Sequence, residues 1–149
     1  MSAKSDEVSR QYVPLHQHAG HLIRRLNQRM LSTFSEKLSG MDVSNVQFAA
    51  LEAISLFEPT TQKEIADYIA MEPSNMHNLL ARLRDRKLIS ITIDQRDPRR
   101  NRVRLTNKGR NLLETVRPLE AQVEPALLAE LSASEKAHLI KLLQKLVNL

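Results

Sequence analysis

Residues 61–106 change their apolar spacing part-way along, and this change constrains the fold more than any other feature of the chain. From Pro73 onward, apolar side chains recur every three or four positions, at Met76, Leu79, Leu80 and Leu83. This spacing is typical of one face of an α-helix. After Lys87 the spacing becomes alternation, with isoleucine at positions 89, 91 and 93, as a half-buried β-strand requires. The stretch therefore predicts a helix that runs into a β-hairpin, whose returning strand carries Val103 and Leu105.

A shorter helix is predicted directly before this one. Thr61 and Glu64 have the spacing of a capping box, in which the two side chains satisfy free backbone N–H groups of the first turn. Ile65, Ala66 and Ile69 supply its apolar face. Pro73 suits the first position of the following helix, because a hydrogen bond is missing there in any case. The two helices and the tight turn between them predict a helix-turn-helix unit.

The second of these helices presents a polar surface outside its apolar stripe. Short hydrogen-bonding side chains lie near its N-terminus and a cation follows one turn later. Side chains of this kind read base edges in the DNA major groove. Taken alone, they also fit an ordinary solvated helix face. The candidate base-contacting residues are Ser74, Asn75, His77, Asn78 and Arg82.

The net charge of the chain is concentrated in the predicted hairpin. Segment 94–110 holds seven cations against two carboxylates, a surplus of five, and the whole chain also carries +5. Arginines packed this closely repel one another unless an anion binds them. A cationic hairpin that projects from a helix-turn-helix unit indicates contact with DNA phosphates. We expect the contacts from Arg96, Arg99, Arg100 and Arg102, with Asp97 holding a neighbouring arginine in place.

The order of these elements resembles the MarR family of transcriptional regulators. The resemblance rests on the hairpin tip Asp94, Arg96, Asp97, Arg99, Arg100 and Asn101, and on Val103, Leu105, Thr106, Lys108 and Gly109 after it. It implies a mainly α fold with a small β-hairpin wing, a winged helix-turn-helix, with residues 44–105 as the DNA-binding lobe. Lys87 departs from the pattern, since the family usually has a glycine just past the recognition helix. That departure leaves the end of the recognition helix open.

The flanking segments predict longer helices. One runs from Pro14 to about Leu38, and a second follows Ser44 as far as the break at residues 58–59. After the wing, Thr106 caps a helix that Pro118 and Pro125 bend or divide, and Ser132 begins the last one. The apolar faces of the terminal helices exceed what one small domain can cover, which is usually resolved by a two-fold dimer. We expect a single domain over 1–149, with residues 14–38 and 106–149 as dimerisation helices, as in the MarR family.

The resemblance also implies a site for a small anionic aromatic effector between the dimerisation helices and the DNA-binding lobe. Four residues are placed on one side of the predicted first helix, where they offer a carboxylate a hydrogen-bond donor, a gap and a cation. They are His16, Gln17, Gly20 and Arg24. A metal site built from His16, His18 and His21 is less favoured, because only the last two approach a common helix face and no acidic ligand lies near.

Composition excludes several other classes of protein. The chain has no cysteine, so disulfides, thiolate metal sites and thiol-based oxidant sensing are absent. It has only three glycines and no phosphate-binding or catalytic motif, so we expect neither an enzyme nor a bound cofactor. No apolar run reaches the ~18 residues of a membrane span. We expect a cytoplasmic protein with no membrane partner.

These observations predict a ligand-responsive DNA-binding regulator. The expected form is a dimeric repressor that binds a palindromic double-stranded operator and leaves it on binding a small aromatic carboxylate or its thioester. Two alternatives remain, a non-specific architectural DNA-binding protein and a metal-responsive repressor. An architectural protein would not need the polar recognition helix, and its specificity ratio would be low.

Overall fold

The computed structural model describes residues 13–149, and its first helical segment is divided where the sequence predicted one helix. A short 3₁₀ turn, η1 (Leu15–Gln17), precedes helix α1 (Ala19–Lys37). His18 between them has extended backbone angles, φ −85° and ψ 122°, and its ring Nε2 lies 3.0 Å from the Val13 carbonyl oxygen. The predicted continuous helix from residue 14 is therefore wrong at its start, because an extended residue interrupts it.

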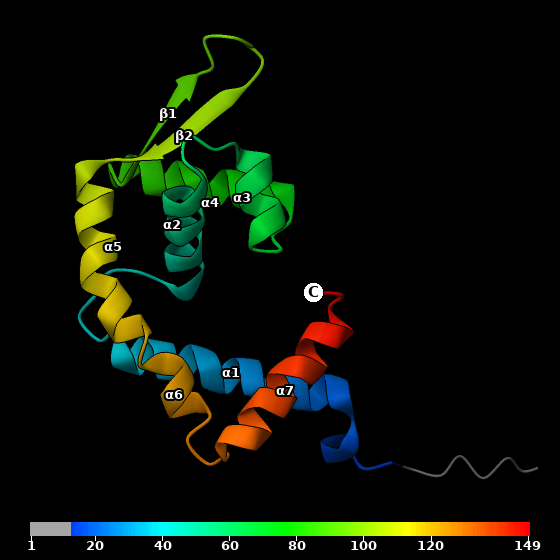
Figure 1. The fold of residues 1–149 in the computed structure, drawn as a ribbon. Coiled ribbons are helices and arrows are strands. Elements are labelled where there is room, and N and C mark those ends of the chain that lie inside the picture. The colour runs from blue at the N-terminus through cyan, green and yellow to red at the C-terminus, as the bar shows by residue number, and fades with distance from the viewer. Residues whose placement is uncertain (1–12) are drawn as a thin grey trace, which may run out of the picture.

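A lobe of three helices and a hairpin follows. Its elements are α2 (Asn45–Phe57), α3 (Gln62–Tyr68), α4 (Pro73–Asp85), β1 (Ile89–Ile93) and β2 (Asn101–Leu105). The strands pair antiparallel, with Ile89 opposite Leu105 and Ile93 opposite Asn101. Figure 1 shows the hairpin projecting beyond the three helices. We call residues 44–105 the winged lobe.

Local sequence signals explain where these helices begin. The predicted capping boxes at Ser44, Thr61 and Ser132 are all formed, each closed by the side chain three residues later. Thr106 caps the helix after the wing by accepting a hydrogen bond from the Gly109 N–H at 3.1 Å. Each cap satisfies backbone donors that would otherwise have no partner. The helix starts were therefore readable from sequence, and these predictions are confirmed.

The core of the protein lies between the helices of the winged lobe and the first helix after it. Ile54 of α2, Ile65 of α3, and Met76 and Leu83 of α4 are fully buried, and Leu113 is 2% exposed. Burial of each such side chain stabilises the fold by ~1.5–3 kcal/mol relative to exposure. Ile93 departs from the expected half-buried face of β1, because the wing extends past the helices and leaves this side chain 66% exposed.

The chain then continues through α5 (Asn107–Glu120) and α6 (Val123–Leu127) to α7 (Ala133–Leu146). The interruption between α5 and α6 falls at Ala121 and Gln122, between the two prolines rather than at either of them. Pro118 lies inside α5, and Pro125 lies inside α6. The predicted division of this segment is confirmed, and it lies three to four residues away from each proline.

Helix α5 is joined to the winged lobe by a bidentate ion pair. Arg117 donates from Nε and Nη2 to the carboxylate of Glu52 on α2, at 2.6 and 3.0 Å, and Nη2 also lies 3.1 Å from Ser55 Oγ. Nearby, burial raises the pKa of Glu120, and the charges of Glu52 and Glu124 add to the effect. Three carboxylates and one guanidinium thus share the junction between α2, α5 and α6.

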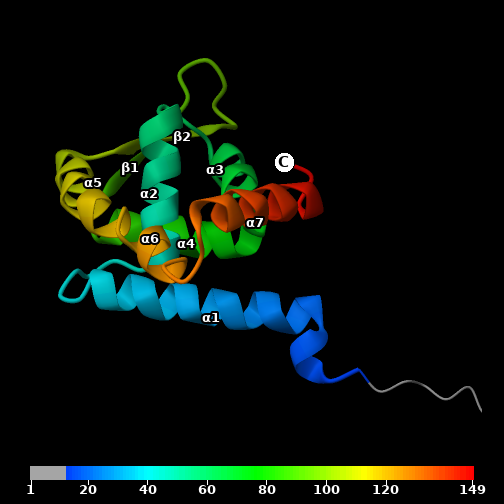
Figure 2. The same cartoon turned by 60° about the horizontal axis from the view of Figure 1, so that its bottom comes forward.

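Helix α7 has no buried residue. Its apolar side chains are partly or largely exposed, including Leu142 at 45% and Leu146 at 69%. Figure 1 projects α7 over α1, but the turned view in Figure 2 shows the two helices well apart. The apolar face that the sequence placed at the C-terminal end is therefore uncovered in a single chain.

Candidate nucleic-acid interface

Helix α4 separates apolar from polar side chains as the sequence predicted. Met76, Leu79, Leu80 and Leu83 are buried, so the opposite surface of the helix faces solvent. All five candidate base-contacting residues lie on that exposed surface, namely Ser74, Asn75, His77, Asn78 and Arg82. The predicted inward face is confirmed. The role of the outward set in base contact stays a prediction.

The end of α4 is settled by a lysine in a conformation that usually belongs to glycine. The helix ends at Asp85 with Arg86 as its cap, and Lys87 has a φ of +59°. A left-handed backbone costs a non-glycine residue roughly 1–2 kcal/mol. Lys87 therefore takes the conformation of the glycine that the family pattern leads one to expect, and the recognition helix ends at Asp85.

Three successive carbonyl groups at the end of α4 are held by the start of α5. The Arg86 carbonyl accepts from Lys108 Nζ at 2.9 Å, and the Lys87 carbonyl accepts from Thr106 Oγ1 at 2.7 Å. The Leu88 carbonyl accepts from the Thr106 N–H at 3.1 Å. Backbone carbonyls that follow the end of a helix need hydrogen-bond partners from elsewhere in the chain. These bonds supply partners and fix the recognition helix to α5.

Gly109 allows this close approach. A methyl group at that position would overlap the Leu88 carbonyl oxygen, and it would also touch the Leu105 side chain at 3.5 Å. Because the obstacle is backbone, the two segments would have to move apart to accept any larger residue. The glycine that closes the family-like motif is thus required by the packing of α5 against the end of α4 and β1.

The base of the wing is stabilised by Asp94. Its carboxylate accepts the Arg96 backbone N–H at 2.8 Å and the Arg102 Nε at 2.6 Å. The backbone hydrogen bond and then the Arg102 side chain hold the pKa of Asp94 below its usual value. Arg102 is accordingly only 31% exposed. Of the wing residues proposed to contact DNA, Arg102 is the one held closest to a carboxylate within residues 13–149.

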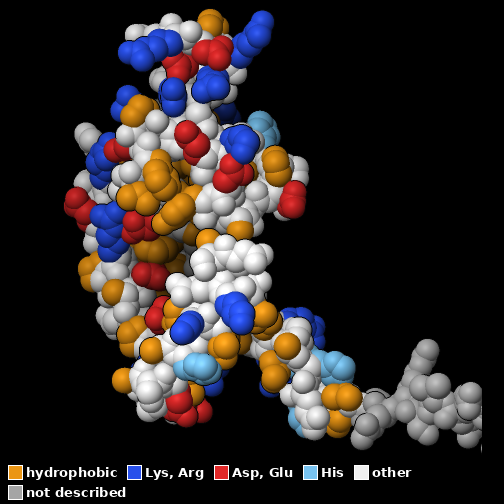
Figure 3. Space-filling view, turned by 45° about the vertical axis from the view of Figure 1, so that its right-hand side comes forward, with side chains coloured by type: hydrophobic (Ala, Val, Ile, Leu, Met, Phe, Trp, Pro, Cys, Tyr) orange, Lys and Arg blue, Asp and Glu red, His pale blue; other side chains and the backbone are white. Residues whose placement is uncertain are grey.

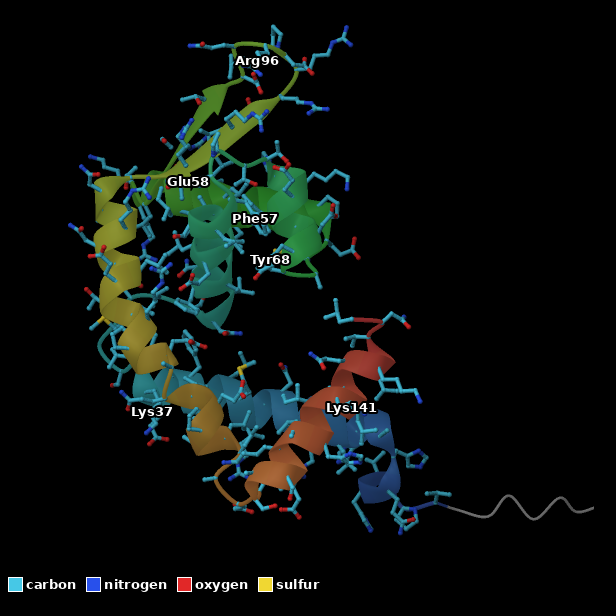
Figure 4. All side chains as sticks on the ribbon, in the orientation of Figure 1. Lys37, Phe57, Glu58, Tyr68, Arg96 and Lys141 are labelled. Carbon is cyan, nitrogen blue, oxygen red and sulfur yellow. The ribbon has the colours of Figure 1, made fainter. Side chains whose placement is uncertain are left out.

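Asp97 orders the tip of the wing, as the sequence predicted. It accepts the Arg99 backbone N–H at 3.0 Å, and its other oxygen lies 3.4 Å from Arg100 Nε. Arg96 and Arg99 have no ion pair among residues 13–149. Figure 4 places Arg96 at the outer end of the wing, and Figure 3 shows cationic side chains gathered there.

Not every cation of segment 94–110 is free to meet an anion. Arg110 forms an ion pair with Glu58, whose other carboxylate oxygen accepts the Leu105 N–H at 2.9 Å. Burial raises the pKa of Glu58, but the bonds from Arg110 and Leu105 outweigh it, so the net shift is downward. Lys108 bonds to a backbone carbonyl. The charge available to a partner therefore lies toward the wing tip rather than at its base.

A groove of about 570 Å³ separates the wing from the helices. Its polar lining includes His77 of the recognition helix and Arg99, Arg100 and Asn101 of the wing. The structure thus brings two of the predicted DNA-contacting segments to opposite walls of one groove. Three polar lining residues were missed by the sequence reasoning, namely Gln62, Lys63 and Arg84. Arg84 could have been found, because it lies two helical turns after His77 on the same side of α4.

Comparison with known proteins places this geometry in a family. Residues 39–100 match the model of the MarR family. A solved structure of a probable transcriptional regulator from Pseudomonas aeruginosa is 30% identical, with a TM-score of 0.83, over 89% of this chain and 98% of that one. The chain belongs to the MarR family. Its fold is the winged helix-turn-helix of that family, and the protein is a DNA-binding transcriptional regulator, not an enzyme.

Two other MarR-family relatives have informative names. The transcriptional repressor NicR of Pseudomonas putida is 27% identical over 89% of this chain and 84% of its own length. BpsR of Bordetella bronchiseptica, whose DNA binding is regulated by 6-hydroxynicotinic acid, is 26% identical with a TM-score of 0.87. That match covers 93% of this chain and 98% of the BpsR chain. Within residues 13–149 no helix is long and apolar enough to cross a membrane.

The four candidate effector residues of this MarR-family chain do not share one helix, so that part of the prediction is wrong. His16 and Gln17 lie in η1, whereas Gly20 and Arg24 lie in α1 beyond the extended His18. All four are exposed. Within the part of the chain that the structure describes, no group of three His, Asp or Glu side chains has the arrangement of a metal site.

Proposed function

We propose that this MarR-family protein is a repressor that binds a palindromic DNA operator as a homodimer in the cytoplasm. The observation that carries the proposal is the pairing of an exposed polar recognition helix with a cationic wing across one groove. A helix in the major groove reads base edges, and wing arginines bind the backbone or the minor groove. Ser74, Asn75, His77 and Asn78 take the first role, and Arg96, Arg99, Arg100 and Arg102 take the second.

The uncovered face of α7 supports the homodimer. A helix with no buried residue gains little from its own chain, and apolar faces of this kind are covered most simply by a second copy about a two-fold axis. Two recognition helices related in this way occupy half-sites about one DNA turn apart, ~34 Å. The operator is therefore expected to be palindromic.

The effector is proposed to be a small aromatic carboxylate or its thioester. The regulation of BpsR by 6-hydroxynicotinic acid supports this chemical class, since that compound combines an aromatic ring with a carboxylic acid. His16, Gln17 and Arg24 supply donors and a cation near Gly20, which leaves open space. A ligand that favours a different spacing between the two winged lobes of the dimer would release DNA. To weaken DNA binding a hundredfold, the ligand has to bind the released form more tightly than the DNA-bound form by only ~2.7 kcal/mol.

The DNA part is tested by binding of the full-length protein to its own upstream DNA against excess bulk DNA. We expect a preference of at least a thousandfold, as for specific regulators. Arg99→Ala with Arg100→Ala should weaken binding to any duplex. It should also make the slope of log affinity against log salt shallower by about one for each phosphate that is no longer neutralised. A specificity ratio near one would favour the architectural alternative, and an unchanged slope would refute the wing assignment.

The effector part is tested with a panel of aromatic acids and their thioesters. One or more should lower operator affinity, and His16→Ala or Arg24→Ala should blunt that response while leaving ligand-free DNA binding nearly intact. Arg25→Ala, one position away on α1, is the matched control. If a divalent metal releases DNA instead, and His18→Ala or His21→Ala abolishes the effect, the protein is a metal-responsive repressor.

A further inference from the structure

Helix α4 carries a cation on each of its two flanks. Arg82 and Arg84 are two residues apart, which places them ~200° apart around an α-helix. Ser74, Asn78 and Ala81 lie between them, on the face opposite the buried stripe. The helix therefore presents two of its base-reading candidates, Ser74 and Asn78, at the centre of the exposed surface, with one arginine at each side.

The flank of Arg84 faces the wing. The groove between helices and wing is lined by His77, Ala81 and Arg84 of α4, and by Arg99 and Arg100 on the opposite wall. Arg82 is not part of that lining, in agreement with its place on the other flank. Arg84 thus joins the wing-tip arginines in lining one groove.

The guanidinium of Arg84 is available to a partner. Its side chain is 58% exposed, and its contact with a charged group is Nη2 to Asp85 Oδ1 at 3.4 Å. An exposed pair at that distance contributes little and yields readily to a better acceptor. The groove lining also contains one carboxylate, Glu64. The Thr61 N–H and neighbouring hydroxyl groups bond to it and hold its pKa down, so the groove keeps four cations against one anion.

We propose that Arg84 binds the DNA strand that runs between the recognition helix and the wing, and that Arg82 binds the opposite strand bordering the same major groove. The major groove is ~12 Å wide and a helix with its side chains is ~10–12 Å across, so the two flanks of a docked helix face the two phosphate walls. The inference rests on the proposed DNA-binding mode and adds a positioning residue. Arg84 fixes how the helix is rotated in the groove and links its contacts to those of the wing.

The test uses full-length protein and a duplex selected by it from a randomised pool. Neutral methylphosphonate linkages are introduced one at a time, and binding is followed by fluorescence anisotropy. Linkages that weaken the wild-type protein mark contacted phosphates. Arg84→Gln should lose sensitivity at linkages of one strand and Arg82→Gln at linkages of the other. Lys37→Gln, at the end of α1 far from the wing in Figure 4, should keep the whole wild-type pattern.

Two further measurements separate possible failures. Arg84→Gln should unfold at the wild-type temperature, and on a fixed unrelated duplex its salt slope should be shallower by about one per protomer. An unchanged slope and linkage pattern, or a loss on the same strand as Arg82→Gln, would overturn the role of Arg84. Failure of the pool to yield any preferred sequence would instead refute specific operator binding, while the slope on the unrelated duplex still decides the role of Arg84.

Discussion

Helices α4 and α7 have almost the same length, 13 and 14 residues, and both carry a row of leucines, yet they differ in how much apolar surface they bury. Helix α4 buries Met76, Leu79, Leu80 and Leu83 inside its own chain. Helix α7 buries none of its residues. Apolar surface stabilises a fold only when it leaves water. The chain itself therefore supplies the apolar burial that stabilises α4, whereas the apolar side chains of α7 stay largely in contact with water.

This difference in burial agrees with the roles proposed for the two helices, DNA recognition for α4 and contact with a second copy for α7. A recognition helix has to be rigid before DNA arrives, because its exposed polar side chains must already be aimed. A helix that contacts a second copy needs its apolar face open until the dimer forms. In the proposed dimer, α4 completes its packing when the chain folds, and α7 completes its packing when two chains associate.

The largest effect is expected where the open face is made polar. Leu139→Asp together with Leu143→Asp should convert the dimer to a monomer, because buried unpaired carboxylates are strongly disfavoured. Operator affinity should fall ~100-fold or more once the two half-sites are no longer bound together. Light scattering and anisotropy measure the two results, with Lys145→Ala on the same helix as control. A double variant that remains dimeric would remove α7 from the interface.

The next effect concerns the closed face of α4. Leu83→Ala should lower the free energy of unfolding by ~2–5 kcal/mol, because apolar burial is reduced and a cavity is left behind. Urea denaturation at a fixed protein concentration measures it. Asn75→Ala on the exposed side should change stability by less than ~0.5 kcal/mol. Similar destabilisation of both variants would mean that α4 is not packed as the structure has it.

A smaller effect is expected on the DNA side of the same helix. Asn78→Ala should cost ~1–3 kcal/mol on the preferred duplex and relax the preference at particular base pairs, because an amide side chain pairs with a base edge in two places. Anisotropy against a set of single-base operator variants measures this. Uniform weakening on every sequence would instead make Asn78 a phosphate contact.

The smallest effect is expected at the junction of the winged lobe with α5 and α6. Burial and the charges of Glu52 and Glu124 raise the pKa of Glu120, so its charged form is disfavoured in the folded state. The stability contributed by its protonated form is present at low pH and is lost as pH rises through the raised pKa. Glu120→Gln should therefore melt slightly higher than wild type at about pH 7.5 and equally at about pH 4. A lower melting temperature at about pH 7.5 would contradict the pKa shift.

The parts of this fold that could be predicted are those encoded by neighbours in sequence. The boxes at Ser44, Thr61 and Ser132 join residues three apart, and the leucine spacing of α4 shows its buried face within four turns. The division of the first helix at His18 has no such signature. No glycine or proline occupies the position of His18, where the helix is interrupted. The interruption coincides with the contact between the His18 ring and the Val13 carbonyl oxygen.

The contacts that sequence reasoning missed join residues far apart in the chain. Arg117 and Glu52 are 65 positions apart, and Gly109 meets the Leu88 carbonyl across the whole wing. The pair Asp94 and Arg102 spans only eight positions. Even so, segment 94–110 carries seven cations, and nothing in their spacing says which one Asp94 selects. The sequence shows how many cationic side chains the wing carries, but only the fold shows which of them already form ion pairs within the protein.

The three carbonyls that the start of α5 holds have a mechanical meaning. The carbonyls of Arg86, Lys87 and Leu88 are all bonded to Thr106 or Lys108, and Gly109 leaves no room for even a methyl group. The connection between α4 and α5 is therefore expected to be rigid. A ligand that tilts α5 would therefore move the recognition helix α4 with it as a rigid body. Bending between the winged lobe and the C-terminal helices would then occur at the short interruption between α5 and α6, at Ala121 and Gln122.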